Sequence, residues 1–300
     1  MSIVNVVDDS IYIPENSIID KSVVGFSNNE EGYDDVFVGD GSTLSGDKTF
    51  SGLYGLDINI GKKCRITGSE VFSGGYFQRV KIGSETEITG SKSFDGCNFL
   101  IRVEIGDNVE IRKERNFANC SMTELSFGKG FALFGKETFY GCDSIEHLVI
   151  PDGAFIHEYR TFAHCKKLKS VRFGNNCLIY TNGMFLGCKN LEAVYFGYNC
   201  RVHGINNLKN CNKLHTIKCG ANFTTDDEIF SLWINKKQKQ YNHVRFEEIP
   251  KGTECSIRME PFDENSVIVQ TTCGHYFNEE CLRKWFLEKK TCPMCRDEFE

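Results

Sequence analysis

The 300-residue sequence is poor in proline and tryptophan, with 5 and 2 residues, and it has no long uninterrupted apolar run. A membrane-spanning helix needs about 20 mostly apolar residues, so the sequence predicts no contact with a membrane. The first residues, MSIVNVVDDSIYIPENS, have neither the basic flank nor the apolar stretch of a secretory signal. We therefore expect a protein that is not secreted by the usual route.

An excess of basic residues is also absent, since the formal net charge at pH 7 is −6. Nucleic-acid-binding domains usually carry a basic patch or stripe, so this balance argues against nucleic acid as a partner.

Cysteine, in contrast, is abundant, with 15 residues. An odd number of cysteines without an export signal does not fit a secreted disulfide framework. Most of these cysteines recur at one position of a repeat. We interpret them as reduced thiols, some buried and some metal ligands, which predicts a reducing compartment, either the cytoplasm or the nucleus.

A repeat of 22 or 23 residues fills most of the chain. Its anchor positions are Phe50, Phe72, Phe94, Phe117, Phe139, Phe162, Phe185 and Leu208. Three residues after the anchor, six units carry Cys97, Cys120, Cys142, Cys165, Cys188 and Cys211. Each unit continues into a short run of alternating apolar residues that ends in glycine or proline, such as SVRFG at 170–174. This alternation predicts a strand with one buried face.

A unit of this length cannot bury its apolar face alone, so neighbouring units are expected to stack into a solenoid. The segment TFAHCKKLKSVRFG at 161–174 resembles the repeats of BspA-like leucine-rich repeat proteins. The resemblance implies a repeat solenoid of short β-strands over residues 1–223. Its repeats are expected from about residue 26, with Phe26 as the anchor of a degenerate first unit. In that family such arrays usually serve as recognition surfaces.

Outward-facing strand positions would form the open face of this solenoid. Val149, Arg172 and Tyr195 occupy such positions on adjacent units. Tyrosine and arginine are enriched in interface hot spots, so these three residues are a candidate site for a protein partner. The alternative is an ordinary solvated face.

Residues 224–252 are expected to form a capping helix and a linker. The segment TTDDEIFSLWINKKQKQ at 224–240 predicts the helix, with Thr225 and Glu228 at the spacing of a capping box. Such a helix would cover the apolar end of the last repeat, as solenoids require.

Residues 253–300 contain the remaining cysteines in a different pattern. Cys273 and His275 form a Cys-x-His pair, and Cys292 and Cys295 form a Cys-x-x-Cys knuckle. Thiolates and imidazole are the donors that structural zinc takes, four at a time, in a tetrahedron.

The segments CSIRMEPF, TTCGHYFNEECLRKWF and TCPMCR resemble a RING finger over residues 255–296. The resemblance implies a small zinc-binding α+β domain with two sites of four ligand positions each. The positions of the first site are Cys255, Arg258, Asn278 and Cys281, and those of the second are Cys273, His275, Cys292 and Cys295. Because Arg258 and Asn278 stand at two ligand positions, we predict one structural zinc, in the second site. Arg258 and Asn278 would hydrogen-bond to each other or to nearby carbonyl groups, helped by a carboxylate such as Glu260.

The same resemblance implies a partner, a ubiquitin-conjugating enzyme charged with ubiquitin. Ile257, Trp285 and Pro293 stand at the docking positions of RING ligases, and Arg296 stands at the basic linchpin position. The expected function is a RING-type ubiquitin ligase whose repeat array binds a protein substrate. Such a ligase positions its reactants and forms no covalent intermediate. The alternatives are an inactive RING-like interaction scaffold and a SUMO ligase. RING modules often dimerise, so a homodimer is also open.

Overall fold

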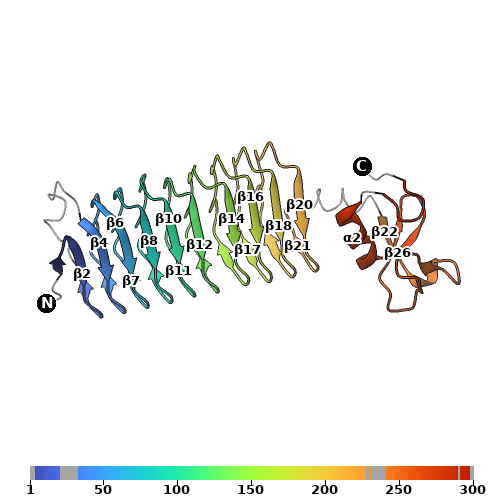
Figure 1. Cartoon of the computed structure of the whole chain (residues 1–300), viewed down its shortest axis with the longest axis horizontal. Helices are drawn as coiled ribbons and strands as arrows, with labels where there is room; N and C mark the ends of the chain where they lie inside the picture. Colours follow the sequence, from blue (N-terminus) through green and yellow to red (C-terminus); the bar gives the residue numbers. More distant parts are fainter. Residues whose placement is uncertain (1–3, 21–32, 228–229, 231–240, 290, 298–300) are drawn as a thin grey trace. The chain divides into compact units, whose positions relative to one another are not determined.

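The computed structural model describes residues 4–20, 33–227, 230, 241–289 and 291–297. Its contacts divide the chain into two compact units, Met1–Ile229 and Phe230–Glu300. Figure 1 shows the first unit as a row of similar coils and the second as a small mixed domain. The fold class expected from the sequence, a β-solenoid followed by a small α+β domain, is confirmed.

The first strand of each coil lies in one of two sheets, whose strands are parallel apart from β1, which pairs with β2 in antiparallel orientation. The seven-stranded sheet has the order β1-β2-β4-β6-β8-β10-β12, and the four-stranded sheet has the order β14-β16-β18-β20. The bounds are β1 Asn5–Val7, β2 Ser10–Ile13, β4 Tyr33–Val38, β6 Gly55–Ile60, β8 Arg79–Ile82, β10 Arg102–Ile105, β12 Glu124–Phe127, β14 His147–Ile150, β16 Ser170–Phe173, β18 Ala193–Phe196 and β20 Thr216–Cys219.

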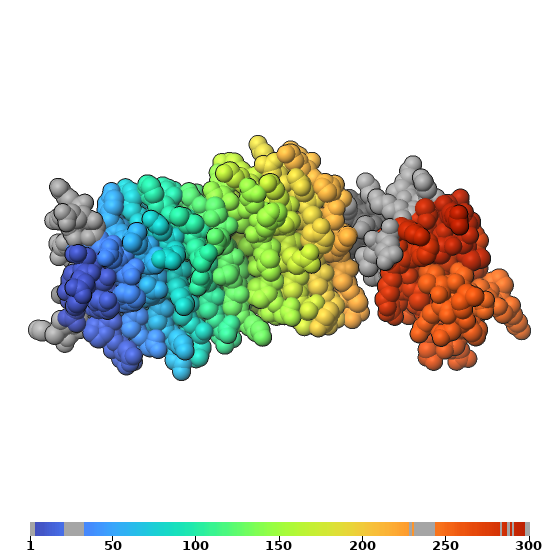
Figure 2. Space-filling model, viewed as in Figure 1, coloured from blue at the N-terminus to red at the C-terminus, as the bar shows by residue number. Residues whose placement is uncertain are grey.

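The second strand of each coil joins a ten-stranded parallel sheet. Its order is β21-β19-β17-β15-β13-β11-β9-β7-β5-β3, so spatial neighbours follow one another along the sequence. The bounds are β3 Ile18–Ile19, β5 Thr43–Leu44, β7 Arg65–Ile66, β9 Glu87–Ile88, β11 Glu110–Ile111, β13 Ala132–Leu133, β15 Phe155–His157, β17 Leu178–Tyr180, β19 Arg201–His203 and β21 Thr224–Thr225. In Figure 2 the coils form adjacent bands in sequence order.

In the first strand of each coil, apolar residues alternate with other residues, and this alternation buries one face of the strand, as predicted. In β16, Val171 and Phe173 are buried while Arg172 is exposed, and in β18 Val194 and Phe196 are buried. Equivalent residues of adjacent coils are paired in register, for example Val171 with Val194. Each strand therefore continues the apolar layer of its neighbour, and the core extends along the whole solenoid.

The anchor phenylalanines form the predicted spine. Neighbouring rings from Phe50 to Phe185 lie parallel, with ring centroids 4.7 to 5.9 Å apart. Contacts between such rings contribute roughly 0.5 to 1.5 kcal/mol per pair beyond the burial of their area.

The repeat cysteines do more than fill space beside this spine. Each thiol donates a hydrogen bond to the carbonyl oxygen of the anchor residue one coil earlier, as Cys142 Sγ does to Phe117 O at 3.1 Å. The same bond recurs at Cys97, Cys120, Cys165, Cys188 and Cys211, with distances of 3.1 to 3.4 Å. Burial raises the pKa of the Cys142 thiol to about 12, so the sulfur keeps its proton at neutral pH.

Replacing Cys142 by alanine should lower the free energy of unfolding by about 1 to 3 kcal/mol, because it leaves a cavity and removes the bond to Phe117 O. Urea denaturation measures the loss. Cys219, which is only partly buried, provides the matched control Cys219→Ala. An equal loss in both variants would show that the buried thiol has no special role.

The coils begin before residue 26, where the sequence analysis expects the first repeat. β2 already pairs in parallel with β4, and Ile11 and Ile13 are buried. The coil was missed because its segment, SIYIPENSII, has neither the phenylalanine anchor nor the cysteine of the later repeats. The predicted anchor Phe26 lies outside the described residues.

The segment predicted as a capping helix starts as a strand and not as a helix. Thr224 and Thr225 form β21, which pairs with β19, so they complete the last coil instead of beginning a helix. Thr225 Oγ1 accepts a hydrogen bond from the Asp227 N–H group at 3.1 Å. Phe230 is helical and buried. The rest of the predicted helix, including Glu228, lies outside the described residues.

From Tyr241 on, the described residues of the second unit form an antiparallel sheet of order β22-β25-β26, a two-stranded ribbon, the short 3-10 helix η2 and the α-helix α2. The bounds are β22 Tyr241–Val244, η2 Phe246–Glu248, β23 Glu254–Cys255, β24 Glu260–Pro261, β25 Ile268–Thr271, β26 Tyr276–Asn278 and α2 Glu279–Glu288. Its buried core comprises Ile249, Cys255, Phe262, Ile268, Val269, Phe277, Leu282 and Cys292. β22 comes from the stretch expected to be a linker, yet it pairs with β25.

Candidate metal centre and docking residues

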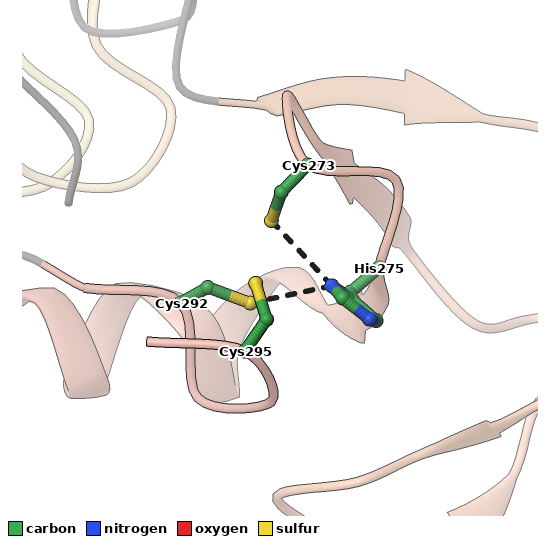
Figure 3. Close-up of side chains that lie close together, drawn as sticks. All are labelled: Cys273, His275, Cys292 and Cys295. Carbon is green, nitrogen blue, oxygen red and sulfur yellow. Dashed lines mark hydrogen bonds between the residues drawn. The ribbon is translucent and has the colours of Figure 1, made fainter. Parts of the chain in front are cut away.

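Four side chains of types that can bind zinc converge in the second unit (Figure 3). Cys273 and His275 lie in the turn between β25 and β26, and Cys292 and Cys295 lie in the knuckle that follows α2. Their ligand atoms all lie within 4.8 Å of one another. His275 Nδ1 is 3.5 Å from the sulfur of both Cys273 and Cys292. Zn–S bonds of about 2.3 Å place tetrahedral ligand atoms roughly 3.5 to 3.8 Å apart, so the donor set fits zinc.

Thr271 fixes the turn that carries the first two ligands. Its hydroxyl lies 3.1 Å from Cys273 Sγ and accepts a hydrogen bond from the His275 N–H group at 3.1 Å. Gly274 follows with a φ of 90°, a conformation that favours glycine. Sequence reasoning missed Thr271, although it lies only two residues before the first ligand.

The surroundings of Cys273 favour the thiolate form of its side chain. Partial burial opposes a charge on the sulfur, but hydrogen bonds with Thr271 and His275 outweigh it and lower the pKa of Cys273 to about 6. The thiolate is the form that binds metal, so this ligand is ready for a cation at neutral pH.

Main-chain and indole hydrogen bonds hold the knuckle. The Cys292 N–H group donates to Asp297 O at 2.8 Å, and the Arg296 N–H group donates to Cys292 O at 2.9 Å. Trp285 Nε1 donates to Thr291 O at 2.7 Å, which fastens α2 to the strand entering the knuckle.

The degenerate first site retains two neighbouring thiols. Cys255 is buried and accepts a hydrogen bond from the Asn278 N–H group at 3.3 Å. Burial, followed by the charge of Cys255, raises the pKa of Cys281. The Cys281 sulfur therefore favours the protonated form more than the Cys273 sulfur does.

Arg258 and Asn278 bind separate partners. Arg258 Nε lies 3.1 Å from a carboxylate oxygen of Glu260, with both side chains more than half exposed. The Asn278 side chain accepts a hydrogen bond from the Glu280 N–H group at 3.1 Å and caps the N-terminus of α2. Among the contacts of the described residues, none joins Arg258 to Asn278. Of the interactions expected from the sequence, the Glu260 pair is the one observed.

The residues at the predicted docking positions lie at least partly on the surface of the second unit. Ile257 is half-buried against the core of the unit, and Trp285 and Pro293 are half-buried, one on the helix and one in the knuckle. Lys289 Nζ lies 4.8 Å from the centroid of the Trp285 ring. Arg296 is exposed, so its guanidinium group is accessible to a partner.

The candidate residues on the solenoid also lie together. Val149 pairs in register with Arg172, and Arg172 with Tyr195. The Arg172 guanidinium carbon lies 5.0 Å from the Tyr195 ring centroid, a cation–π distance. Val149 beside them is 60% exposed. We keep these three residues as a candidate partner site.

Similarities to known proteins fall on the two units separately. The profile of the BspA type leucine rich repeat region matches six copies over residues 35–145 and 113–234, and that of the Ring finger domain matches residues 253–296. The chain is 40% identical over 47 residues to E3 ubiquitin-protein ligase RNF128 of Xenopus laevis, which is 16% of this chain and 12% of that protein. It is 43% identical over 47 residues to RING-H2 finger protein ATL30 of Arabidopsis thaliana, which is 15% of this chain and 16% of that protein. The chain thus matches less than a fifth of the length of either relative.

Among solved structures, the T. pallidum leucine rich repeat protein TpLRR aligns with 78% of this chain and 92% of its own. The sequence identity is 19% and the TM-score is 0.40. Within the described part of the chain, no helix is long and apolar enough to cross a membrane. From the repeat matches over most of its length, the chain belongs to the BspA type leucine rich repeat family, and it carries a Ring finger domain in residues 253–296.

Proposed function

We propose that this chain is a RING-type ubiquitin ligase. Its C-terminal unit recruits a ubiquitin-conjugating enzyme charged with ubiquitin, and its solenoid binds the protein substrate. The observation that carries the proposal is the complete Cys273, His275, Cys292 and Cys295 cluster in a Ring finger domain. The relatives named E3 ubiquitin-protein ligase support it over this domain alone. The free thiols of the solenoid fit a reducing compartment, the cytoplasm or the nucleus.

The chain's residues act by positioning. Ile257, Trp285 and Pro293 offer apolar surface to the conjugating enzyme, and the hydrogen bond from Trp285 to Thr291 O holds helix and knuckle in one arrangement. Arg296, exposed after the last ligand, donates hydrogen bonds to enzyme and ubiquitin together. Restricting the charged ubiquitin to a reactive pose removes an entropic part of the barrier to aminolysis. No side chain of this chain forms a covalent intermediate with the ubiquitin in transit.

Zinc supplies a structural cross-link when it is bound. Cys273, His275, Cys292 and Cys295 of the second site would hold it through three sulfurs and one imidazole nitrogen. At the first site, Arg258 has no lone pair to offer a cation, and the Asn278 side chain is engaged by the helix N-terminus. The Arg258–Glu260 pair and the Asn278 cap hold this part of the domain in place of a metal.

Native mass spectrometry of the purified chain should therefore find one zinc ion. The variant Cys295→Ser should release it, whereas Cys281→Ser, which alters the degenerate site, should retain it. Two tightly held ions in the unaltered chain would contradict the assignment.

A second candidate function is an inactive RING-like scaffold. The observation that favours it is the loss of two ligand positions at Arg258 and Asn278, beside the predicted docking residue Ile257. A shift of this loop would misplace Ile257 while leaving the second metal site intact.

An autoubiquitination assay with a panel of conjugating enzymes separates the two functions. The ligase predicts ubiquitin adducts that require the activating enzyme, ATP and at least one member of the panel. Absence of adducts with every member would favour the scaffold.

A further inference from the structure

The ten-stranded sheet directs two columns of side chains outward, on either side of a buried middle residue. In the coils of β7 and β9 the columns are polar, with Thr67, Thr89 and an ion pair between Arg65 and Glu87 at 3.7 Å. From β13 to β17 the same columns hold His157 and four apolar or aromatic residues, Phe134, Phe155, Leu178 and Tyr180. We call these four residues the aromatic patch.

The rings of the aromatic patch contact one another across coils. Ring centroids lie 5.2 Å apart for Phe134 and Phe155, and 6.1 Å apart for Phe155 and Tyr180. The Tyr180 ring also stacks on the His203 ring of the next coil, with the two rings nearly parallel and their centroids 5.0 Å apart. Phe134, Phe155 and Leu178 are half-buried and Tyr180 is 37% exposed. An apolar patch bordered by polar residues on a soluble surface is typical of an interaction site.

A polar groove adjoins the patch at Phe134. It has a volume of about 520 Å³ and is lined by serine and threonine hydroxyls and by Arg112, Lys113 and Lys136. The guanidinium carbon of Arg112 lies 4.8 Å from the Phe134 ring centroid. The groove thus places hydrogen-bond donors and cations directly beside the aromatic rings.

Two of the carboxylates around the patch have a cationic partner: Glu110 pairs with Arg112, and Glu114 with Lys136. Glu158 and Asp226 lie beside the imidazoles of His157 and His203, which carry a charge only when protonated. Lys113 and Arg201 are exposed, and the described part of the chain gives neither a carboxylate partner. One cation lies at each end of the patch, which calls for two acidic groups on the partner.

The spacing of these cations sets the length of the partner segment. Lys113 follows β11 and Arg201 begins β19, which are four strands apart in the sheet. At about 4.8 Å per strand this is about 19 Å along the solenoid, which an extended chain covers in about six residues. Because the sheet strands here are paired on both sides, recognition relies on side chains and not on an added strand.

We propose that this face binds an extended protein segment in which about four to six apolar residues lie between two acidic residues. The apolar residues cover the aromatic patch, and the acidic residues pair with Lys113 and Arg201. That this segment belongs to a substrate rests on the ligase function proposed above. The binding itself does not, and it is measured without ubiquitin.

The test selects twelve-residue peptides from a random displayed library on the immobilised full-length chain. An enriched peptide, labelled with fluorescein, is then titrated with the chain in solution and followed by anisotropy. We expect enrichment of acidic pairs that bracket an apolar stretch. The variant Phe155→Ala/Tyr180→Ala and the variant Lys113→Glu/Arg201→Glu should each weaken binding at least about tenfold, as loss of interface anchors does.

Two exposed residues outside this face provide matched controls, Tyr198→Ala and Lys189→Glu, and each should change the affinity less than about twofold. Thermal unfolding checks that all variants fold. The proposal is overturned if no peptide is enriched, if the enriched peptides lack the acidic pair, or if the patch variants bind as tightly as the unaltered chain. It is also overturned if the chain self-associates and Tyr180→Ala makes it monomeric, because the face then binds a second copy. An inactive ligase that still binds the peptides would contradict only the proposed function.

Discussion

Replacing Cys292 by serine is expected to unfold the C-terminal unit and leave the solenoid folded. Cys292 is fully buried and belongs both to the zinc cluster and to the core of its unit. Binding of structural zinc contributes about 10 to 16 kcal/mol in small zinc-finger peptides, more than a domain of this size stores in its apolar core. The solenoid has its own continuous core, so it does not depend on the metal.

Hydrogen–deuterium exchange of the full-length chain, resolved by peptide, measures both units in one experiment. Peptides from β25, β26 and α2 should lose their protection in Cys292→Ser, while peptides around Phe117 and Phe139 keep theirs. Chelation of zinc from the unaltered chain should give the same pattern. Met294→Ala is the matched control, since this exposed residue lies in the same knuckle and is not a ligand. Protection of α2 that survives zinc removal would refute the structural role of the metal.

Replacing Arg296 or Ile257 by alanine should lower the rate of ubiquitin transfer at least about tenfold, as removal of a reactant-positioning or hot-spot contact does. The Arg296 side chain is exposed, so its loss leaves the fold intact. Ile257 packs partly against the core, so its loss also costs about 1 to 2 kcal/mol of stability. Trp285 is a less clean test, because it holds the knuckle through Thr291 O.

The assay compares initial rates of adduct formation at equal zinc content. Val267→Ala is the matched control, an apolar residue of the same unit that is 52% exposed and stands at no docking position. Unchanged rates in both Arg296→Ala and Ile257→Ala, with an active unaltered chain, would mean that another surface recruits the conjugating enzyme.

Much of the solenoid could be predicted because its information is repeated. Most coils contain the anchor phenylalanine, the cysteine and the alternating strand, so a weak signal in one unit is supported by its neighbours. The first coils could not be found this way, because Ile11 and Ile13 are buried in a segment without the anchor. Strand β22 was missed for a different reason: its pairing with β25 depends on a contact between residues distant in sequence.

The cluster of Cys273, His275, Cys292 and Cys295 was predictable because zinc chemistry allows few residue types at few spacings. The residues that tune it were not, since Thr271 is one of many threonines until the turn brings its hydroxyl to Cys273. Likewise, the roles of Arg258 and Asn278 depend on which acceptors lie near them once the domain folds.

The aromatic patch could not be predicted from the sequence for a related reason. The partner site predicted from the sequence lies on the first strands of three adjacent coils, at Val149, Arg172 and Tyr195. The patch consists of different residue types from different coils, and only the register of the second sheet aligns Phe134, Phe155 and Tyr180 into one surface. Side chains that lie outside the repeat consensus are free to specialise, and in this chain they form the candidate binding face.

The autoubiquitination assay tests the central claim most directly, because it asks whether a Ring finger domain with one complete metal site still works. With the full-length, zinc-loaded chain, our account predicts ATP-dependent ubiquitin adducts with at least one conjugating enzyme of the panel, and their loss in Arg296→Ala. A folded, zinc-loaded chain that forms no adducts with any conjugating enzyme would contradict it.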